Sequence, residues 1–208
     1  MKERIAIGGS AANPPHLGHL ALINHLLEFG GFDKIIWIPS GNRKDKNNLI
    51  SPDHRVAMTM LNFDLDWLYK KKSVFMINFQ DVYGENQPTI YWMNEMQKQN
   101  PAAEIIWYTG VDSVVPQKHF DGKCEIEKKW ICGEELMREW TFCILPRTGY
   151  VHPLKLQLPS QFFILDGNLP NISSTDICRR IASGKPFEHL VSKEVNAYIK
   201  RFGLYGYE

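Results

Sequence analysis

The sequence lacks long apolar runs, an excess of charge of either sign and paired cysteines, and each absence excludes a class of protein. Its apolar runs fall far short of the roughly 18 residues that cross a membrane as a helix, so we expect no membrane partner. Lys and Arg total 24 against 23 Asp and Glu, a net charge of +1, so no overall positive field favours nucleic acid. The four cysteines include no CxxC pair, which argues against a zinc site or a disulfide framework.

The start of the chain also lacks the features of a secretory signal. Only a short apolar run, residues 5–7, follows the charged residues 2–4, so we expect a cytoplasmic protein. The 208 residues are 44% apolar and 23% charged, which is typical of a globular chain. Because no internal repeat and no linker-like stretch interrupts them, residues 1–208 are expected to form a single domain.

Apolar runs alternate with helix-like patterns along the chain. Strands are expected at residues 4–8, 34–39, 73–77, 104–109, 141–145 and 161–165. Helices are expected at residues 17–29, 51–65 (or on to 68), 88–99, 175–183 and 192–202, with two weaker ones at 125–131 and 133–139. The alternation predicts an α/β fold: a Rossmann-like doubly wound parallel sheet with flanking helices and a C-terminal helical segment. In such sheets, ligands bind at the carboxyl ends of the strands.

The most informative stretch is residues 5–19, in which an apolar run ends in two glycines and a serine, and a helix begins soon afterwards. Free backbone N–H groups and the positive end of a helix dipole meet at such a junction, which suits a phosphate group. His16 and His19 are three residues apart in the first helical turn, so both can reach the same anion. The turn has neither GxGxxG nor the Gly-Lys-Ser/Thr of a P-loop, so the two histidines are expected to replace the P-loop lysine.

Four further blocks stand at expected strand ends and helix starts. They are Ile38-Pro39-Ser40-Gly41-Asn42 with Lys46 nearby, His54-Arg55-Val56-Ala57-Met58, Gly110-Val111-Asp112 and Ile172-Ser173-Ser174-Thr175-Asp176-Ile177. A loop lysine and the hydroxyls of a helix start suit phosphate, and a carboxylate after a strand suits ribose hydroxyls. Together with residues 5–19, these blocks resemble the HxGH nucleotidylyltransferase superfamily. Within it they look most like the nicotinate (or nicotinamide) mononucleotide adenylyltransferases.

The resemblance covers residues 5 to 183 and implies adenylyl transfer. In that reaction the phosphate of a pyridine mononucleotide attacks the α-phosphate of ATP, and pyrophosphate leaves. The attacking phosphate is already ionised near neutral pH, so catalysis rests on positioning and on stabilisation of charge, with Mg²⁺ accompanying ATP. The expected partners are ATP and nicotinate or nicotinamide mononucleotide, in NAD biosynthesis, and the resemblance leaves a homo-oligomer open.

The resemblance also assigns roles by position. Catalysis would fall to His16, His19 and Lys46. ATP would be bound by Gly8, Gly9, Ser10, Gly18, Gly110, Asp112, Ile172, Ser173, Ser174, Thr175 and Arg179. The mononucleotide would be bound by Asn13, Arg55, Thr89, Tyr91 and Trp130. Aromatic side chains suit a flat cationic pyridinium ring, and core packing explains the same residues equally well. Protein groups are not expected to dominate the coordination of the metal.

The sequence departs from the family pattern at Cys178, where the motif ISSTxIR has an arginine. Arg179 follows, but one residue turns a helix by about 100°, so Arg179 is not an automatic substitute. The phosphate lysine also has two candidates, Lys44 and Lys46.

Two alternative functions therefore stay open. The first is a nucleotidylyltransferase with another acceptor. It would be either an adenylyltransferase that acts on phosphopantetheine or a cytidylyltransferase that uses CTP. The second is a nucleotide-binding sensor with weakened catalysis.

Overall fold

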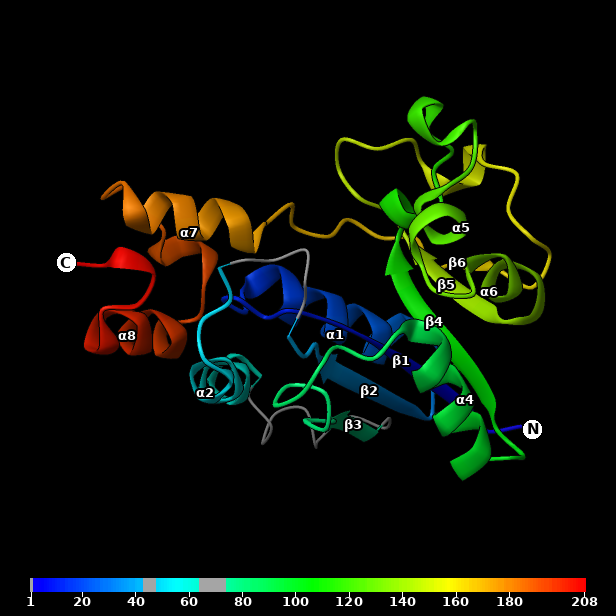
Figure 1. Cartoon of the computed structure of the whole chain (residues 1–208), viewed down its shortest axis with the longest axis horizontal. Helices are drawn as coiled ribbons and strands as arrows, with labels where there is room; N and C mark the ends of the chain where they lie inside the picture. The colour runs from blue at the N-terminus through cyan, green and yellow to red at the C-terminus, as the bar shows by residue number, and fades with distance from the viewer. Residues whose placement is uncertain (1, 43–47, 64–73) are drawn as a thin grey trace.

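The computed structural model describes residues 2–42, 48–63 and 74–208. Its centre is a six-stranded parallel sheet in the order β3-β2-β1-β4-β5-β6 (Figure 1). The strands are β1 (Arg4–Ser10), β2 (Lys34–Pro39), β3 (Val74–Ile77), β4 (Glu104–Gly110), β5 (Thr141–Leu145) and β6 (Phe163–Ile164). The chain adds strands to one side of β1 and then, from β4 on, to the other, so the topological switch lies between β1 and β4. The predicted doubly wound α/β fold is confirmed.

Helices lie on both faces of the sheet and beside it. They are α1 (Leu17–Phe29), α2 (Pro52–Asn62), α4 (Thr89–Gln99), α5 (Glu125–Lys129), α6 (Gly133–Glu139), α7 (Ser174–Ala182) and α8 (Lys193–Phe202). Side chains alternate between the faces along a strand. Ala6 therefore joins Ile23 and Leu26 of α1 in one buried cluster, and Ile5 and Ile7 join a second cluster on the opposite face.

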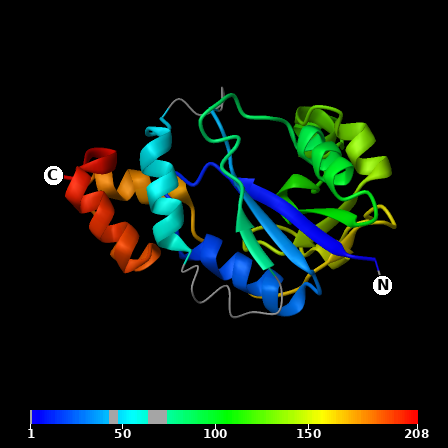
Figure 2. The ribbon, with the colours of Figure 1, turned by 90° about the horizontal axis from the view of Figure 1, so that it is seen from below.

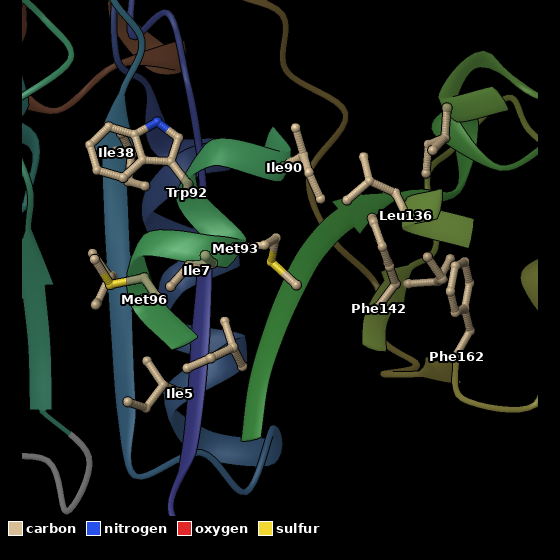
Figure 3. Close-up of a cluster of buried hydrophobic side chains, with 14 of the residues drawn as sticks. Ile5, Ile7, Ile38, Ile90, Trp92, Met93, Met96, Leu136, Phe142 and Phe162 are labelled. Carbon is tan, nitrogen blue, oxygen red and sulfur yellow. The ribbon is translucent and has the colours of Figure 1, made fainter. Parts of the chain in front are cut away.

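The second cluster is built around α4. Figure 3 shows Met93 and Met96 of α4 lying over Ile5 and Ile7 of β1. Side chains from α5, α6 and β5 extend the same cluster, including the buried Phe142. This apolar layer covers β1 and β4 on the face opposite α1.

A third cluster lies beside the sheet and joins α2, α7 and α8. Figure 2 shows these three helices gathered at the end of the molecule that carries the C-terminus. Met58 of α2 packs there with Ile177 of α7 and Val195 of α8. The last turn, η5 (Leu204–Gly206), closes the cluster with Leu204. Helix α7, which carries the ISST block, is held in place by this packing.

Three predicted boundaries need correction. β1 runs to Ser10 because its last two residues still pair with Ile38 and Pro39 of β2. β6 is confined to residues 163–164, although a strand was predicted over 161–165. The predicted helix 51–65 ends at Asn62, because Phe63 turns into extended backbone.

Packing explains the early end of α2. Phe63 is fully buried, and its ring centroid lies 5.3 Å from that of Trp37 and 5.2 Å from that of Phe75. Continuing the helix would withdraw this ring from the sheet. The part of the helix prediction beyond Phe63 falls outside the described residues.

Candidate active site

Gly8 and Gly9 stand near the end of β1, where neighbouring strands leave no room for a side chain. A Cβ on Gly8 would lie 2.7 Å from the ring of Tyr108 on β4, and one on Gly9 would lie 1.8 Å from the carbonyl oxygen of Ile38. Gly8 is buried, whereas Gly9 is exposed at the end of the strand. Strand packing thus accounts for both glycines, and their contact with ATP stays a prediction.

His16 and His19 follow this turn and cap the start of α1 together. The Nδ1 atom of His16 accepts the backbone N–H of His19 at 3.3 Å, and Nδ1 of His19 accepts the N–H of His16 at 3.2 Å. The two rings stack with centroids 3.6 Å apart and an interplanar angle of 15°. Both Nδ1 atoms are acceptors, so each neutral ring carries its proton on Nε2. His19 Nε2 then donates to Oγ of Ser10, 3.1 Å away.

Burial and a nearby cation set the charge state of His16. Burial, and then the nearby positive charge of Arg147, lower the pKa of His16 from 6.5 to about 4. His16 is only 5% exposed and is therefore a neutral hydrogen-bond donor near neutral pH. A neutral His16 can still donate a hydrogen bond, so the role of both histidines at phosphate stays a prediction, and Arg147 adds a positive charge near His16.

Arg147 was missed in the sequence. Its Nη1 atom lies 2.6 Å from Oδ2 of Asp112, which follows β4 in the short turn η1 (Val111–Ser113). A Cβ on Gly110 would lie 2.4 Å from Oδ1 of Asp112 and 3.9 Å from Cδ of Arg147, so the glycine makes room for this pair. Arg147 comes two residues after β5, and the rule that ligands bind at the carboxyl ends of strands could have identified it.

A cavity of about 610 Å³ opens beside this ion pair, a size suited to a small ligand. Its lining comes from the segments that follow β5 and β6, including Arg147, Tyr150, His152, Asp166 and Asn168. This cavity therefore combines a cation, an aromatic ring and polar groups at the carboxyl ends of β5 and β6.

The start of α7 lies against the histidine turn. Ser174 Oγ donates to the carbonyl of Pro14 at 2.8 Å. Gly18 allows the close approach of α1, since a Cβ there would lie 3.0 Å from Nδ1 of His16 and 3.4 Å from Cβ of Ile172. Two distant parts of the sequence thus form adjoining walls, and N–H groups at a helix start suit phosphate.

A second cavity, of about 420 Å³, lies along the start of α7 and is lined in part by Ile172, Ser173, Thr175 and Arg179. Arg179 is tied to Asp176, and Nε of Arg180 lies 2.7 Å from the same carboxylate. Hydrogen bonds from Arg180 and Arg179 lower the pKa of Asp176. Arg179 is thus held at the surface, and its contact with ATP stays a prediction.

Cys178 points a different way from Arg179. Its Sγ donates to the carbonyl of Asn13 at 3.4 Å, so this side of α7 faces the loop that leads to His16. The motif position that has an arginine in the family therefore borders the histidine turn.

Two predicted substrate-binding residues instead brace the loops of the site. Arg55 is 1% exposed, and its Nη1 atom donates to the carbonyls of Ala11 and Ser40 at 3.1 and 2.6 Å. Burial lowers its pKa. The side chain of Asn13 bonds to Ile50 and Asn48, in the segment before α2. These contacts are structural, and direct contact of either side chain with a substrate stays a prediction.

The substrate contacts predicted for Thr89, Tyr91 and Trp130 stay predictions. Thr89 and Tyr91 lie in the first turn of α4, and Tyr91 is 42% exposed with its ring against Trp92. Trp130 follows the last residue of α5 and packs against Trp107, with ring centroids 6.3 Å apart. Both segments border the same core cluster, so packing accounts for much of their aromatic content. The predicted phosphate lysine, Lys46, and its alternative, Lys44, lie outside the described residues.

Neither a metal cage nor a membrane helix is found within residues 2–42, 48–63 and 74–208. In these ranges no group of three or more His, Cys, Asp or Glu side chains is placed to hold a metal ion. No helix there is both long and apolar enough to cross a membrane.

A Rossmann-like sheet with a paired-histidine turn, a helix start and an Arg–Asp pair at its switch point defines a nucleotidyltransferase type of protein. The chain belongs to the cytidylyltransferase-like family, whose model matches residues 7–180. The chain is 26% identical over 211 residues to a probable nicotinate-nucleotide adenylyltransferase of Caldicellulosiruptor saccharolyticus, covering 97% of this chain and 98% of that protein. It is 27% identical over 205 residues to the nicotinate-nucleotide adenylyltransferase of Bacillus subtilis, covering 98% of each.

A solved structure shares the fold. Nicotinic acid mononucleotide adenylyltransferase of Plasmodium falciparum, in complex with NaAD, superposes with a TM-score of 0.80 at 17% identity, covering 99% of this chain and 98% of that one. The resemblance inferred from the sequence blocks is confirmed at the level of the superfamily and of the nicotinate mononucleotide adenylyltransferases.

Proposed function

We propose that this protein transfers the adenylyl group of ATP to nicotinate mononucleotide and releases pyrophosphate, with nicotinate adenine dinucleotide as the product. The observation that carries the proposal is the mutual capping of His16 and His19, which leaves Nε2 of each neutral ring as the donor. The names of the relatives support this acceptor. The reaction belongs to NAD biosynthesis.

The chemistry follows from these donors. A phosphate oxygen of the mononucleotide attacks the α-phosphorus of ATP, the bond to the bridging oxygen breaks, and pyrophosphate leaves with the electron pair. The attacking oxygen is already ionised, so no base has to remove a proton. Negative charge grows on the α-phosphate and on the leaving group. The guanidinium of Arg147 and the Nε2–H of His16 stabilise this charge, and the Nε2–H of His19 joins them when it turns from Oγ of Ser10 to the phosphate.

Helix α7 and Asp112 complete the proposed ATP site. The N–H groups at the start of α7 receive phosphate, with Ser173 and Thr175 adding hydroxyls. Asp112 keeps Oδ1 for ribose hydroxyls while Oδ2 holds Arg147 at 2.6 Å. The ion pair thus orients the cation whose charge the reaction needs.

Mg²⁺ enters this proposal as an ion carried by ATP. It prefers oxygen ligands and is commonly held by substrate phosphates together with one or two carboxylates. The site offers imidazoles, hydroxyls, a guanidinium and one carboxylate that is already paired with Arg147. This set of side chains fits an ion that is held mainly by the triphosphate. Such an ion neutralises part of the phosphate charge when it is bound.

We further propose that residues 1–208 work as one nucleotidylyltransferase domain. Contacts between the two ends of the chain support this, because Ser174 reaches Pro14 and the Tyr205 hydroxyl reaches Asn13 at 3.1 Å. A cytoplasmic location, a homo-oligomer and the lack of a nucleic-acid partner stay predictions.

An acceptor panel tests the proposal. The protein is incubated with Mg²⁺-ATP and, in separate reactions, nicotinate mononucleotide, nicotinamide mononucleotide or phosphopantetheine, with a parallel set containing CTP. Pyrophosphate release should be fastest with ATP and nicotinate mononucleotide. Release that depends on another acceptor, or on CTP, would overturn the substrate assignment.

The sensor alternative rests on Cys178, where the family motif has an arginine. It predicts ATP binding without pyrophosphate release for any acceptor. If the enzyme assignment holds, Cys178→Arg should keep or raise kcat/KM for ATP, because this side of α7 faces the histidine turn.

A further inference from the structure

The side chain of Asn13 joins three segments of the chain three residues before His16. Its Nδ2 atom donates to the carbonyl of Asn48 at 3.0 Å. Its Oδ1 atom accepts the backbone N–H of Ile50 at 3.3 Å and the hydroxyl of Tyr205 at 3.1 Å. Both lone pairs of Oδ1 are used, and the bond from Nδ2 fixes which way the amide faces. Asn13 is therefore held from two sides, one of them near the C-terminus.

The backbone of the turn η5 places the hydroxyl of Tyr205 within hydrogen-bond distance of Asn13. Tyr205 has φ of 61°, in the left-handed region that residues with a Cβ disfavour, and it stands between Gly203 at 58° and Gly206 at 79°. Leu204, beside it, is buried in the cluster of α7 and α8. Burial raises the pKa of Tyr205, so its hydroxyl stays protonated and remains a donor.

The loop that these bonds hold is also bonded to α2 and α7. Arg55 of α2 donates to the carbonyl of Ala11 at 3.1 Å, two residues before Asn13. Ser174 of α7 donates to the carbonyl of Pro14, immediately after it. The hydrogen bond of Tyr205 to Asn13 adds a third contact. It connects η5 to the loop that leads to His16 and His19.

We propose that Tyr205 is a positioning residue for adenylyl transfer, which acts through Asn13 to set the loop from which His16 and His19 project. The proposal rests on the proposed function for its kinetic consequence. Its structural content, a hydroxyl near the C-terminus that orders the histidine turn, can be measured separately.

Tyr205→Phe removes the hydroxyl and keeps the ring. We expect kcat to fall about fivefold to tenfold, the order expected for one lost hydrogen bond, with a smaller change in KM for ATP. Tyr207→Phe is the matched control, because Tyr207 lies in the same segment but packs against Phe187 and Lys200. Its kcat should equal that of the wild type.

A double-mutant cycle separates positioning from general stability. In an Asn13→Ala background, Tyr205→Phe should cause no further loss of kcat, because the acceptor is already gone. A Tyr205 that merely stabilised the fold would lower the melting temperature and the active fraction equally in both backgrounds. Equal losses of kcat in the two backgrounds would overturn the proposal.

A readout independent of turnover completes the test. In Tyr205→Phe, hydrogen exchange of the Ile50 amide should accelerate, and the NMR ring signals of His16 and His19 should shift. Unchanged exchange and unchanged ring signals would overturn the proposal, whatever the kinetics. If the wild type releases no pyrophosphate with any acceptor, the proposed function fails, and these NMR and exchange results alone decide whether Tyr205 orders the turn.

Discussion

His16 and His19 hold each other across the first turn of α1, each ring accepting the backbone N–H of the other residue. One pair of side chains thus caps a helix and also fixes the tautomers of two donors. A change at either position is therefore expected to affect both the capping of α1 and the donation of hydrogen bonds to phosphate.

Replacing His19 by alanine removes a donor to the phosphates. We expect kcat to fall by about 10²–10³-fold, as for other donors that act on developing charge. Pyrophosphate release under saturating substrates measures the effect. His189→Ala is the control, because His189 is exposed in the turn η4 (Glu188–Leu190), has no assigned role in the reaction and should leave kcat unchanged. Turnover of His19→Ala near the wild-type rate would refute the assigned role.

The lowered pKa of His16, about 4 against 6.5, predicts a dependence of stability on pH. The unfolded chain binds a proton below about pH 6.5 that the folded chain accepts only near pH 4, so acidification favours unfolding in this window. The contribution is present above the unfolded pKa and declines as the pH falls, by up to about 3 kcal/mol.

Urea unfolding at several pH values checks this contribution of His16. His16→Asn is the matched variant, because asparagine also caps a helix start but does not titrate. The wild type should lose more free energy of unfolding between pH 6.5 and 4 than the variant does. Equal losses in the two proteins would show that His16 titrates normally in the folded state.

Replacing Arg147 by glutamine removes the positive charge beside His16 and Asp112. We expect kcat/KM for ATP to fall by about 10–100-fold, because a charge-assisted contact to phosphate is lost. The pKa of His16 should also rise, since Arg147 is the second cause of its depression after burial. Steady-state kinetics and an NMR titration of the His16 ring measure the two effects. Arg138→Gln, at a surface pair with Glu139, should change neither quantity.

Gly9→Ala tests the packing at the end of β1. The added Cβ would meet the carbonyl oxygen of Ile38 at 1.8 Å, so β1 and β2 would have to separate. We expect a loss of about 3 kcal/mol or more in the free energy of unfolding. Gly84→Ala is the control, because its Cβ would approach only the carbonyl of Asp81, at 4.0 Å. Similar melting temperatures for the two variants would contradict the packing argument.

Local sequence patterns were sufficient to predict most helices and strands and the pairing of His16 with His19. The apolar run of β2 and the helix start at Ser51-Pro52 are short-range signals, and both appear where they were expected. His16 and His19 could be paired from their spacing because helical geometry places residues three apart on one face. Where a nonlocal contact decided a boundary, as the burial of Phe63 does for α2, the local pattern was not enough.

The sequence by itself determined the alternation of strands and helices and the turn that carries His16 and His19, because hydrophobic period, glycines and capping residues act within a few positions. The tertiary structure alone decided the charge of the site. It brings Arg147 to Asp112 across 35 positions, buries His16 so that it stays neutral, and turns Arg55 inward as a brace. Burial and long-range ion pairs depend on which strands become neighbours, and spacing along the chain does not record that.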